Sequence, residues 1–340
     1  MCGIVAYIGQ KEAFPIVLSG LKRLEYRGYD SAGVALLKDG NINIHKKQGK
    51  VSNLEEAVEG KDISASRGIG HTRWATHGPP NDKNAHPHIS ESGDLVVVHN
   101  GIIENYDTLK QELENKGYTF RSDTDTEVLS YLISDIKEKT GYKLAKSVRL
   151  ALKQVVGAYA IVVMCKDEPN KLVAARKSSP LVLGIGKDND FYVASDATPI
   201  VEFTKQVVYL NDGEIAILNE EKGLKLYDHD EDLQDPYIEE LELHLEALEK
   251  GGYDHFMLKE IHEQPRSIED CFRGRLNASE GWVSLGGIKY YEDDIIKANR
   301  VVMVACGTSW HACLVGEYFC LLYTSPSPRD LSTSRMPSSA

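Results

Sequence analysis

The chain has 340 residues, of which 42% are hydrophobic and 26% charged, and its formal net charge at pH 7 is −12. This length allows a substantial buried core and two domains. The negative charge disfavours nucleic acid and anionic lipid as partners, and no apolar run approaches the roughly 18 residues that cross a bilayer, so neither a nucleic-acid nor a membrane partner is expected.

The hydrophobic periodicity predicts both strands and helices along the first two thirds of the chain. Alternating or continuous apolar runs predict strands at residues 4–8, 34–37, 95–98, 159–164 and 191–194. Apolar residues spaced three and four apart predict helices at residues 14–24, 106–116, 126–137 and 143–155. Because strands cluster between the helices rather than alternate with them, we expect an α+β fold with antiparallel sheets. Lys11 and Glu12 interrupt the first apolar stretch, so no secretory signal is predicted and the protein is expected to be cytoplasmic.

The composition changes after residue 218. Residues 219–250 are rich in acidic side chains and are interpreted as a solvated linker that runs into a helix. A second domain is predicted from residue 251, with a buried strand at 301–304 that leads through Thr308 and Ser309 into a helix. Residues 320–340 are rich in serine and proline and show neither the helical nor the strand periodicity of apolar residues. We therefore expect a disordered, non-native tail, and a natural protein that continues beyond about Phe319.

Cys2 follows the initiator methionine directly. Removal of Met1 would place a thiol and a free α-amine on one residue. An α-amine titrates near pH 8 and a thiol near 8.5, so both groups reach their reactive states close to neutral pH. N-terminal nucleophile hydrolases use such a pair to cleave amides, although a small second residue also occurs by chance.

Other segments contain the groups that an amide-cleaving cysteine needs. Arg73 lies in a polar, turn-rich stretch and can hold a carboxylate with its planar guanidinium. Asn100 and Gly101 follow a predicted strand, where an amide and a backbone N–H can converge on an oxyanion. Asp125 opens a predicted helix, and its carboxylate can either cap that helix or bind an ammonium group. Each feature alone also has a purely structural explanation.

Together, these segments resemble the glutaminase domain of the glutamine–fructose-6-phosphate transaminase (isomerizing) family. The likeness spans residues 1–319. It is carried by MCGIV, LEYRGYDSAG, HTRWATHG, NAHPH, VVHNGIIENY and SDTDTEV, and it continues in HFMLKEIHEQP and ACGTSWHA. The resemblance implies an N-terminal-nucleophile hydrolase type four-layer αββα sandwich at residues 2–218, followed at residues 251–319 by the start of an incomplete α/β sugar-isomerase domain.

The resemblance also implies a role for each matching residue. Cys2 would form a γ-glutamyl thioester, with its α-amine as proton acceptor and donor, and Asn100 and Gly101 would bind the oxyanion. Arg73 would bind the glutamine α-carboxylate and Asp125 its α-amino group. Thr76 and His77 would complete the pocket, Trp74 would lie on a loop that closes over it, and Arg27 would help to organise the site. In the second domain, Thr308 and Ser309 would contact a sugar phosphate. The implied substrates are glutamine and, in a full-length homodimer, fructose 6-phosphate.

No cofactor or metal is expected. The six cysteines form no CxxC pair, and His71, His77, His86 and His88 are better explained by buried hydrogen bonds than by a metal site. Two other functions stay open: a different class II amidotransferase, which would make phosphoribosylamine, or a non-catalytic module that senses glutamine. The YRGYDSAG and HTRWATHG segments favour the hexosamine reaction over the first, and an intact set of Cys2, Arg73, Asn100 and Asp125 argues against the second.

Overall fold

The chain forms two units in a computed structural model, residues 1–252 and residues 253–340, and each is described by itself. The structure describes residues 2–75, 77–228, 232–241, 252–272, 276–277, 281–283, 291–298, 300, 302–305 and 307–324. The disordered tail expected at 320–340 is wrong for its first part, because residues 320–324 belong to a helix that ends at Thr324, and residues 325–340 lie outside the described residues. The segment at 242–251 also lies outside them. No helix in the described part of the chain combines the length and hydropathy needed to cross a lipid bilayer.

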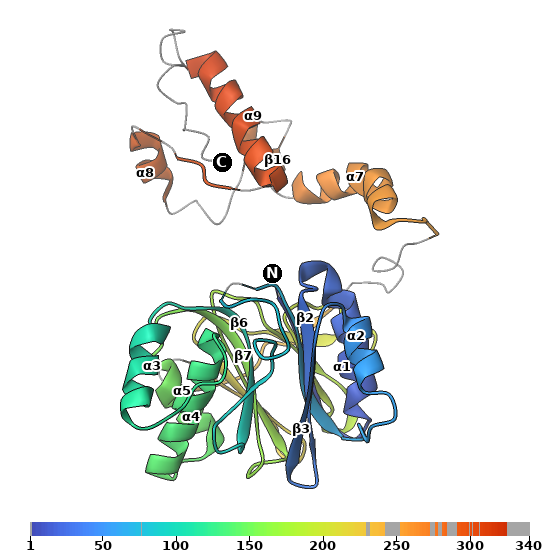
Figure 1. Cartoon of the computed structure of the whole chain (residues 1–340). Coiled ribbons are helices and arrows are strands. Elements are labelled where there is room, and N and C mark those ends of the chain that lie inside the picture. Colours follow the sequence, from blue (N-terminus) through green and yellow to red (C-terminus); the bar gives the residue numbers. More distant parts are fainter. Residues whose placement is uncertain are drawn as a thin grey trace. The chain divides into compact units, whose positions relative to one another are not determined.

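The first unit contains two antiparallel sheets (Figure 1). Sheet A has eight strands in the order β15-β11-β9-β10-β1-β4-β2-β3. These strands are β1 (Gly3–Ile8), β2 (Ser31–Lys38), β3 (Asn41–Gln48), β4 (Arg67–Arg73), β9 (Val182–Ile185), β10 (Phe191–Ala194), β11 (Gln206–Tyr209) and β15 (Glu239–Glu240). Sheet B has seven strands in the order β14-β13-β12-β8-β7-β6-β5. They are β5 (His88–Ile89), β6 (Leu95–Ile103), β7 (Gly157–Cys165), β8 (Lys171–Lys177), β12 (Ile215–Asn219), β13 (Gly223–Tyr227) and β14 (Leu233–Gln234).

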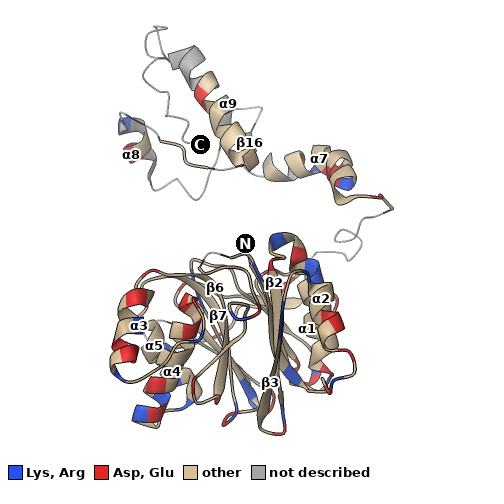
Figure 2. Cartoon of the chain, viewed as in Figure 1, with Lys and Arg blue, Asp and Glu red and all other residues tan. Residues whose placement is uncertain are grey.

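Helices cover the outer face of each sheet, which gives the four layers α, β, β, α. Sheet A is covered by one pair of helices and sheet B by three (Figure 1). The first pair is α1 (Ala13–Leu24) and α2 (Val51–Ala57), and the three are α3 (Tyr106–Asn115), α4 (Asp125–Thr140) and α5 (Leu144–Leu152). Short 3-10 turns occur at Glu25–Arg27 and Lys187–Asn189. In this unit the charged side chains lie mainly on the helices, and the strands carry mostly other residues (Figure 2).

Three hydrophobic clusters fill the spaces between these layers. The side chains of β1 alternate between two of them: Ile4, Ala6 and Ile8 face the cluster between the sheets, whereas Val5 and Tyr7 face α1 and α2. Successive side chains of a strand point to opposite faces, and a strand buried on both faces is therefore continuously apolar. This burial explains the apolar run that predicted the first strand.

The predicted elements of this unit are confirmed with small shifts at their ends. The strands predicted at 4–8, 95–98 and 191–194 correspond to β1, β6 and β10, and the helices predicted at 106–116 and 126–137 correspond to α3 and α4. Thr124 caps α4, because its hydroxyl accepts the N–H of Glu127. Gly141 ends the helix in the left-handed conformation that glycine adopts without steric cost.

The segment after residue 219 differs from the expected solvated linker. β13 pairs with β12 along its full length, β14 extends sheet B further, and β15 pairs with β11 in sheet A. Leu226 and Leu241 are buried. Hydrophobic residues between the acidic ones therefore tie this segment to both sheets of the first unit.

The second unit contains three helices and a short hairpin among its described residues. These are α7 (Phe256–Phe272), α8 (Glu292–Lys297), α9 (Gly307–Thr324) and the paired strands β16 (Leu276–Asn277) and β17 (Trp282–Val283). The buried strand expected at 301–304 is wrong where it is described: residues 302–305 are irregular, and Val302, Met303 and Val304 are exposed. A buried strand requires paired neighbours, and in the described part of this unit only β16 and β17 pair.

Candidate active site

Cys2 directly precedes β1, which is an interior strand of sheet A. β1 is paired on one side with β4 and on the other with β10, so both neighbours hold its backbone. The Cys2 Sγ accepts the backbone N–H of Trp74 at 3.2 Å. Behind the cysteine, a side chain at Gly3 would come within 2.6 Å of the Thr72 Oγ1, so the strand approaches its neighbour as closely as glycine allows. The thiol is therefore fixed at the end of a rigid strand.

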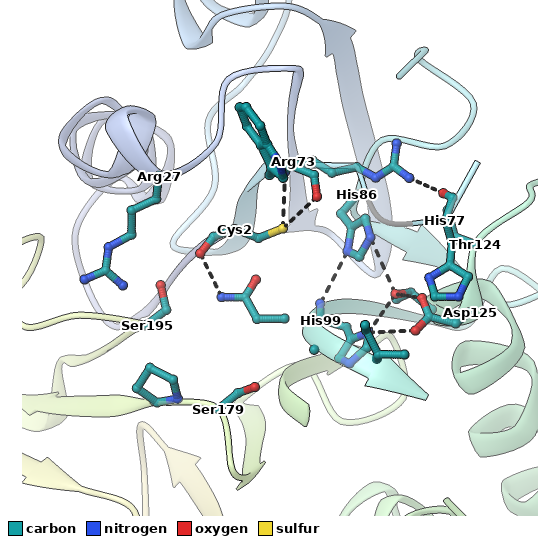
Figure 3. A pocket seen from close by; sticks show the side chains of 16 residues that line it. Cys2, Arg27, Arg73, His77, His86, His99, Thr124, Asp125, Ser179 and Ser195 are labelled. Atoms are coloured by element: carbon teal, nitrogen blue, oxygen red, sulfur yellow. Dashed lines mark hydrogen bonds and ion pairs between the residues drawn. The ribbon is translucent and has the colours of Figure 1, made fainter. Parts of the chain in front are cut away.

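A cavity of about 350 Å³ opens at the Cys2 thiol (Figure 3). The predicted site residues in its lining are Cys2, Arg27, Arg73, Trp74, His77, Asn100, Gly101 and Asp125. They come from the start of β1, the turn after α1, the end of β4, the middle of β6 and the start of α4. The structure thus brings together residues that the sequence places more than a hundred positions apart.

Asn100 and Gly101 lie in β6 next to the nucleophile. The Asn100 Nδ2 donates to the backbone carbonyl of Cys2 at 3.1 Å. Gly101 has a φ of +132°, and a Cβ at this position would lie 2.0 Å from the carbonyl oxygen of Ala158. Only glycine fits this backbone. An oxyanion hole requires hydrogen-bond donors beside the nucleophile. The side-chain amide of Asn100 and the backbone N–H of Gly101 are candidates for these donors.

Arg73 and Asp125 bring opposite charges to the same cavity. Arg73 ends β4 and is 3% exposed, and its guanidinium donates to the carbonyl oxygens of His77, Gly78 and Pro79. Burial lowers the pKa of Arg73. Asp125 begins α4 and is 5% exposed, and its Oδ2 accepts the N–H of Ile103 at 3.0 Å. A cation and an anion fixed in one pocket suit a zwitterionic amino acid.

Burial raises the pKa of the Cys2 thiol. The N–H of Trp74 lowers this pKa, whereas the carboxylate of Asp30 raises it. Asp30 also accepts the N–H of Ala75, and its own N–H donates to the Arg73 carbonyl oxygen at 3.1 Å. Asp30 therefore anchors the loop that contains Trp74. Asp30 lies within the LEYRGYDSAG segment, but nothing in the sequence indicates this contact.

The remaining predicted residues surround the opening of the cavity. Trp74 is 48% exposed and packs edge-on against Tyr29, with ring centroids 5.4 Å apart. His77 contacts the ring of Tyr106 edge-on. Arg27 forms an ion pair with Asp196. Thr76 lies outside the described residues.

The cavity lining also includes residues that no sequence pattern indicated. Ser179, Pro180 and Ser195 belong to it, and the hydroxyl of Ser195 accepts the N–H of Ile4 at 3.0 Å. These residues lie in loops beside β9 and β10 and match no pattern with an evident chemical purpose. Only the fold brings them to Cys2.

Four buried histidines lie beside the cavity: His71, His86, His88 and His99. His71 stacks on His86 with ring centroids 4.1 Å apart, and the His88 Nε2 lies 3.0 Å from the Thr124 hydroxyl. Burial lowers the pKa of each ring, to about 3 for His71. His71, His86 and His88 are buried and hydrogen-bonded as predicted, whereas His77, which was included in that prediction, is only half-buried. His99 was not singled out from the sequence.

The described residues contain one group of potential metal ligands, and it lies away from the cavity. Asp94, Cys165 and Asp167 have ligand atoms within 4.8 Å of one another. The Lys137 Nζ lies 2.5 Å from the Asp167 Oδ2 and 3.5 Å from the Asp94 Oδ2. Because the lysine ammonium pairs with both carboxylates, the group is explained as an ion-pair network.

Thr308 and Ser309 lie in the second unit, in the first turn of α9, and both are exposed. Their predicted contact with a sugar phosphate stays a prediction.

Comparison with known proteins finds glutamine amidotransferases. Residues 71–202 match the family model of a glutamine amidotransferase domain. The chain is 56% identical over 319 residues to a glutamine–fructose-6-phosphate aminotransferase (isomerizing) from Bacteroides thetaiotaomicron, and 54% identical over 323 residues to one from Chlorobaculum tepidum. Each alignment covers 94% of this chain and 52% of the relative. This chain thus spans about half the length of the curated relatives it matches.

A solved structure of glutamine phosphoribosylpyrophosphate amidotransferase from B. subtilis is similar to this chain with a TM-score of 0.58 and 30% identity, over 68% of this chain and 50% of that one. Fold and site together define a class II glutamine amidotransferase domain with an N-terminal-nucleophile hydrolase-like fold of two antiparallel sheets. Within this class, the chain is homologous to the glutamine–fructose-6-phosphate aminotransferases (isomerizing).

Proposed function

We propose that this chain hydrolyses glutamine to glutamate and ammonia, with Cys2 as the nucleophile. The observation that carries the proposal is the convergence of Cys2, Asn100, Arg73 and Asp125 on one cavity. Figure 3 labels Cys2, Arg73 and Asp125 there. Arg73 would hold the α-carboxylate of glutamine and Asp125 its α-ammonium group. The γ-amide would then lie toward the thiol, with the backbone N–H of Gly101 and the Nδ2 of Asn100 near its oxygen.

The first half of the reaction forms a thioester. With Met1 removed, the α-amine of Cys2 takes the thiol proton and the sulfur attacks the carbonyl carbon (Cδ) of the glutamine side-chain amide, so that a C–S bond forms and the carbonyl oxygen becomes an oxyanion. Asn100 and Gly101 stabilise that charge. The oxyanion then collapses, the C–N bond breaks, and the α-ammonium returns the proton to the departing ammonia.

The second half releases glutamate. Water attacks the thioester carbon, its proton passes to the α-amine, and the same donors stabilise a second oxyanion. The C–S bond then breaks and the sulfur regains a proton. The sum is glutamine and water in, glutamate and ammonia out, with no oxidant, metal or cofactor in the balance.

For a protein that also contains the remaining half of the relatives' length, we propose the reaction after which they are named. Ammonia would convert fructose 6-phosphate to glucosamine 6-phosphate and would travel inside a homodimeric protein, shielded from water. Thr308 and Ser309, at the start of α9, would contact the sugar phosphate. For the 340-residue chain itself we propose glutamine hydrolysis without amination of the sugar.

The identity values favour this assignment over a phosphoribosylamine-forming enzyme. The aminotransferase from Bacteroides thetaiotaomicron is 56% identical, against 30% for the phosphoribosylpyrophosphate amidotransferase. A purely sensing module would need Arg73 and Asp125 to bind glutamine, but it would have no use for a thiol with an adjacent oxyanion-type donor.

The decisive experiment measures glutamate release from glutamine by the purified chain and by Cys2→Ala. We expect steady release by the first and loss of at least about 10³-fold by the second, as for other covalent nucleophiles. Cys313→Ala serves as a control, because Cys313 lies in α9 of the second unit. Equal rates for the chain and Cys2→Ala would refute the proposal. Mass spectrometry of the intact protein tests whether Met1 is removed.

A further inference from the structure

His71 does not line the cavity, yet its ring is bonded to a residue that does. It lies in β4, where its backbone pairs with Ile4 of β1 and Gly33 of β2, and it is 1% exposed. Its Nε2 is 2.9 Å from the Asn100 Oδ1 and 3.0 Å from the carbonyl oxygen of His99. The ring therefore holds both the side chain of Asn100 and the backbone just before it.

The two contacts determine where the imidazole proton lies. A backbone carbonyl oxygen can only accept a hydrogen bond, so the His71 Nε2 must carry hydrogen. The His71 Nδ1 is buried and has no hydrogen-bond partner within the described structure. Protonation of Nδ1 would bury a charge and an unpaired donor, and burial accordingly lowers the pKa of His71 to about 3. The ring is neutral and its Nε2–H is shared between two acceptors.

This donor decides which way the Asn100 amide faces. With Oδ1 turned to His71, the Nδ2 is turned to Cys2 and donates to its carbonyl oxygen at 3.1 Å. The opposite orientation would set the amide N–H group against the His71 N–H, and the amide oxygen against the Cys2 carbonyl oxygen. Both contacts would be repulsive. His71 thus selects the orientation in which the Asn100 amide presents a donor on the side of Cys2, where the oxygen of the reacting amide would lie.

The ring itself is held in place by its surroundings. It stacks on His86 with an interplanar angle of 14°, and the His86 Nδ1 accepts the N–H of His99 at 3.4 Å. Any rotation of His71 about its side-chain bonds would break this packing and leave the carbonyl oxygen of His99 without this donor. A donor placed by a central strand and a stacked ring is well suited to fix a catalytic amide.

We propose that His71 is a positioning residue for the oxyanion hole: its Nε2–H orients the Asn100 amide so that Nδ2 stabilises the tetrahedral intermediate. This inference rests on the proposed glutaminase function. His71 does not touch the substrate, and its contribution to the rate passes through Asn100.

The test compares two substitutions of the same residue. His71→Phe keeps a flat ring but removes the donor, and we expect kcat for glutamine hydrolysis to fall about 10²-fold with the KM for glutamine changed less than about threefold. His71→Gln places an amide N–H near the position of Nε2, and its kcat is expected to be at least about tenfold higher than that of His71→Phe. His45→Phe, in β3 of the same sheet and outside the cavity lining, is expected to match the unsubstituted protein.

A double-substitution cycle separates positioning from a general structural effect. In an Asn100→Ala background, His71→Phe should lower kcat less than about threefold, because the residue on which His71 acts is gone. The inference is overturned if His71→Phe keeps the original kcat, or if it causes the same loss in both backgrounds. In either case Cys2-dependent glutamate release by the unsubstituted protein would show that the proposed function still stands.

Spectra of the unsubstituted protein with 15N-labelled histidine test the inference without any activity, even if His71→Phe does not fold. The His71 signals, assigned through His71→Gln, should show hydrogen on Nε2 and none on Nδ1 from pH 8 to pH 5. A proton on Nδ1 in that range would overturn the inference. Loss of the proposed function alone would leave this pattern unchanged.

Discussion

The side-chain amide of Asn100 donates to the backbone carbonyl of Cys2 at 3.1 Å, although the two residues are 98 positions apart in the chain. The contact joins β6 of sheet B to the start of β1 in sheet A, so it links the two sheets at the nucleophile. The geometry of the site therefore depends on how the sheets pack as well as on each strand.

Asn100→Ala should lower kcat for glutamine hydrolysis by about 10²- to 10³-fold, because it removes one donor to the oxyanion. The KM for glutamine should change little, since the α-carboxylate and α-ammonium contacts remain. Steady-state glutamate release measures both constants. Asn43→Ala, an exposed position in β3, is the control. A variant with full kcat would show that Asn100 serves only to join the sheets.

Gly101→Ala should destabilise the first unit as well as abolish activity. The added Cβ would lie 2.0 Å from the Ala158 carbonyl oxygen at a φ of +132°, so β6 or β7 must shift. We expect the free energy of unfolding to fall by about 3 kcal/mol or more. Gly117→Ala has a φ of +97° and no atom within 4 Å, so it should cost only about 1 kcal/mol. Urea unfolding followed by circular dichroism compares the two, and equal losses would contradict the clash.

Asp125→Asn should weaken glutamine binding with a smaller effect on turnover. The substitution removes the negative charge that we assign to the α-ammonium group and leaves an oxygen that can still accept the N–H of Ile103. Loss of one charge-assisted hydrogen bond raises KM by about 10- to 100-fold. Kinetics of glutamate release test this, with Asp107→Asn in the exposed first turn of α3 as the control. An unchanged KM would remove Asp125 from the binding site.

Alkylation of Cys2 by iodoacetamide should be slow at neutral pH and should rise with pH, because burial raises the pKa of its thiol. Its half-maximal rate should occur at a higher pH than that of a small free thiol. Asp30→Asn removes a charge that raises this pKa, so it should speed alkylation at pH 7.5. Peptide mass spectrometry measures the rate, and glutamine should protect the thiol. A faster reaction than the small thiol at pH 7 would contradict this prediction.

The buried histidines should make the first unit less stable in acid. Burial lowers the pKa of His71 and His88 below the ordinary 6.5, so the unfolded chain binds protons that the folded chain does not. The stability that each neutral ring provides is complete above pH 6.5 and is lost as the pH falls, by about 2 kcal/mol per histidine at pH 5.

Urea unfolding at pH 7.5 and pH 5.0 measures this loss. Between the two pH values, the free energy of unfolding of His88→Gln should fall by about 2 kcal/mol less than that of the unsubstituted protein. The carboxylates are the same in both proteins, so their contribution cancels in this comparison. An identical loss in the two proteins would show that His88 is not responsible.

Periodicity predicted most elements of the first unit because its sheets are buried on both faces. The apolar run at residues 4–8 and the spacing of apolar residues in 126–137 follow directly from that burial. The acidic segment after residue 219 was misleading, because a few apolar side chains such as Leu226 outweigh many charges in deciding whether a short strand pairs. The strand expected at 301–304 failed for the opposite reason: its residues are apolar, but no described neighbour pairs with them.

The main site residues were predictable because their chemistry is recognisable in the sequence. Cys2, Arg73, Asn100 and Asp125 have side chains whose types match the reaction. The contacts of His71 and Asp30 with those residues were not predictable, because a buried histidine or aspartate has the same appearance in a sequence whether it supports a catalytic group or a loop.

The position of Cys2 at the end of a strand paired on both sides has a practical consequence for anyone who produces this protein. By the mechanism proposed above, an affinity tag or fusion partner placed ahead of Cys2 would convert the α-amine into an amide and remove the proton acceptor. Such material should fold and still fail to hydrolyse glutamine, so purification handles belong at the other end of the polypeptide.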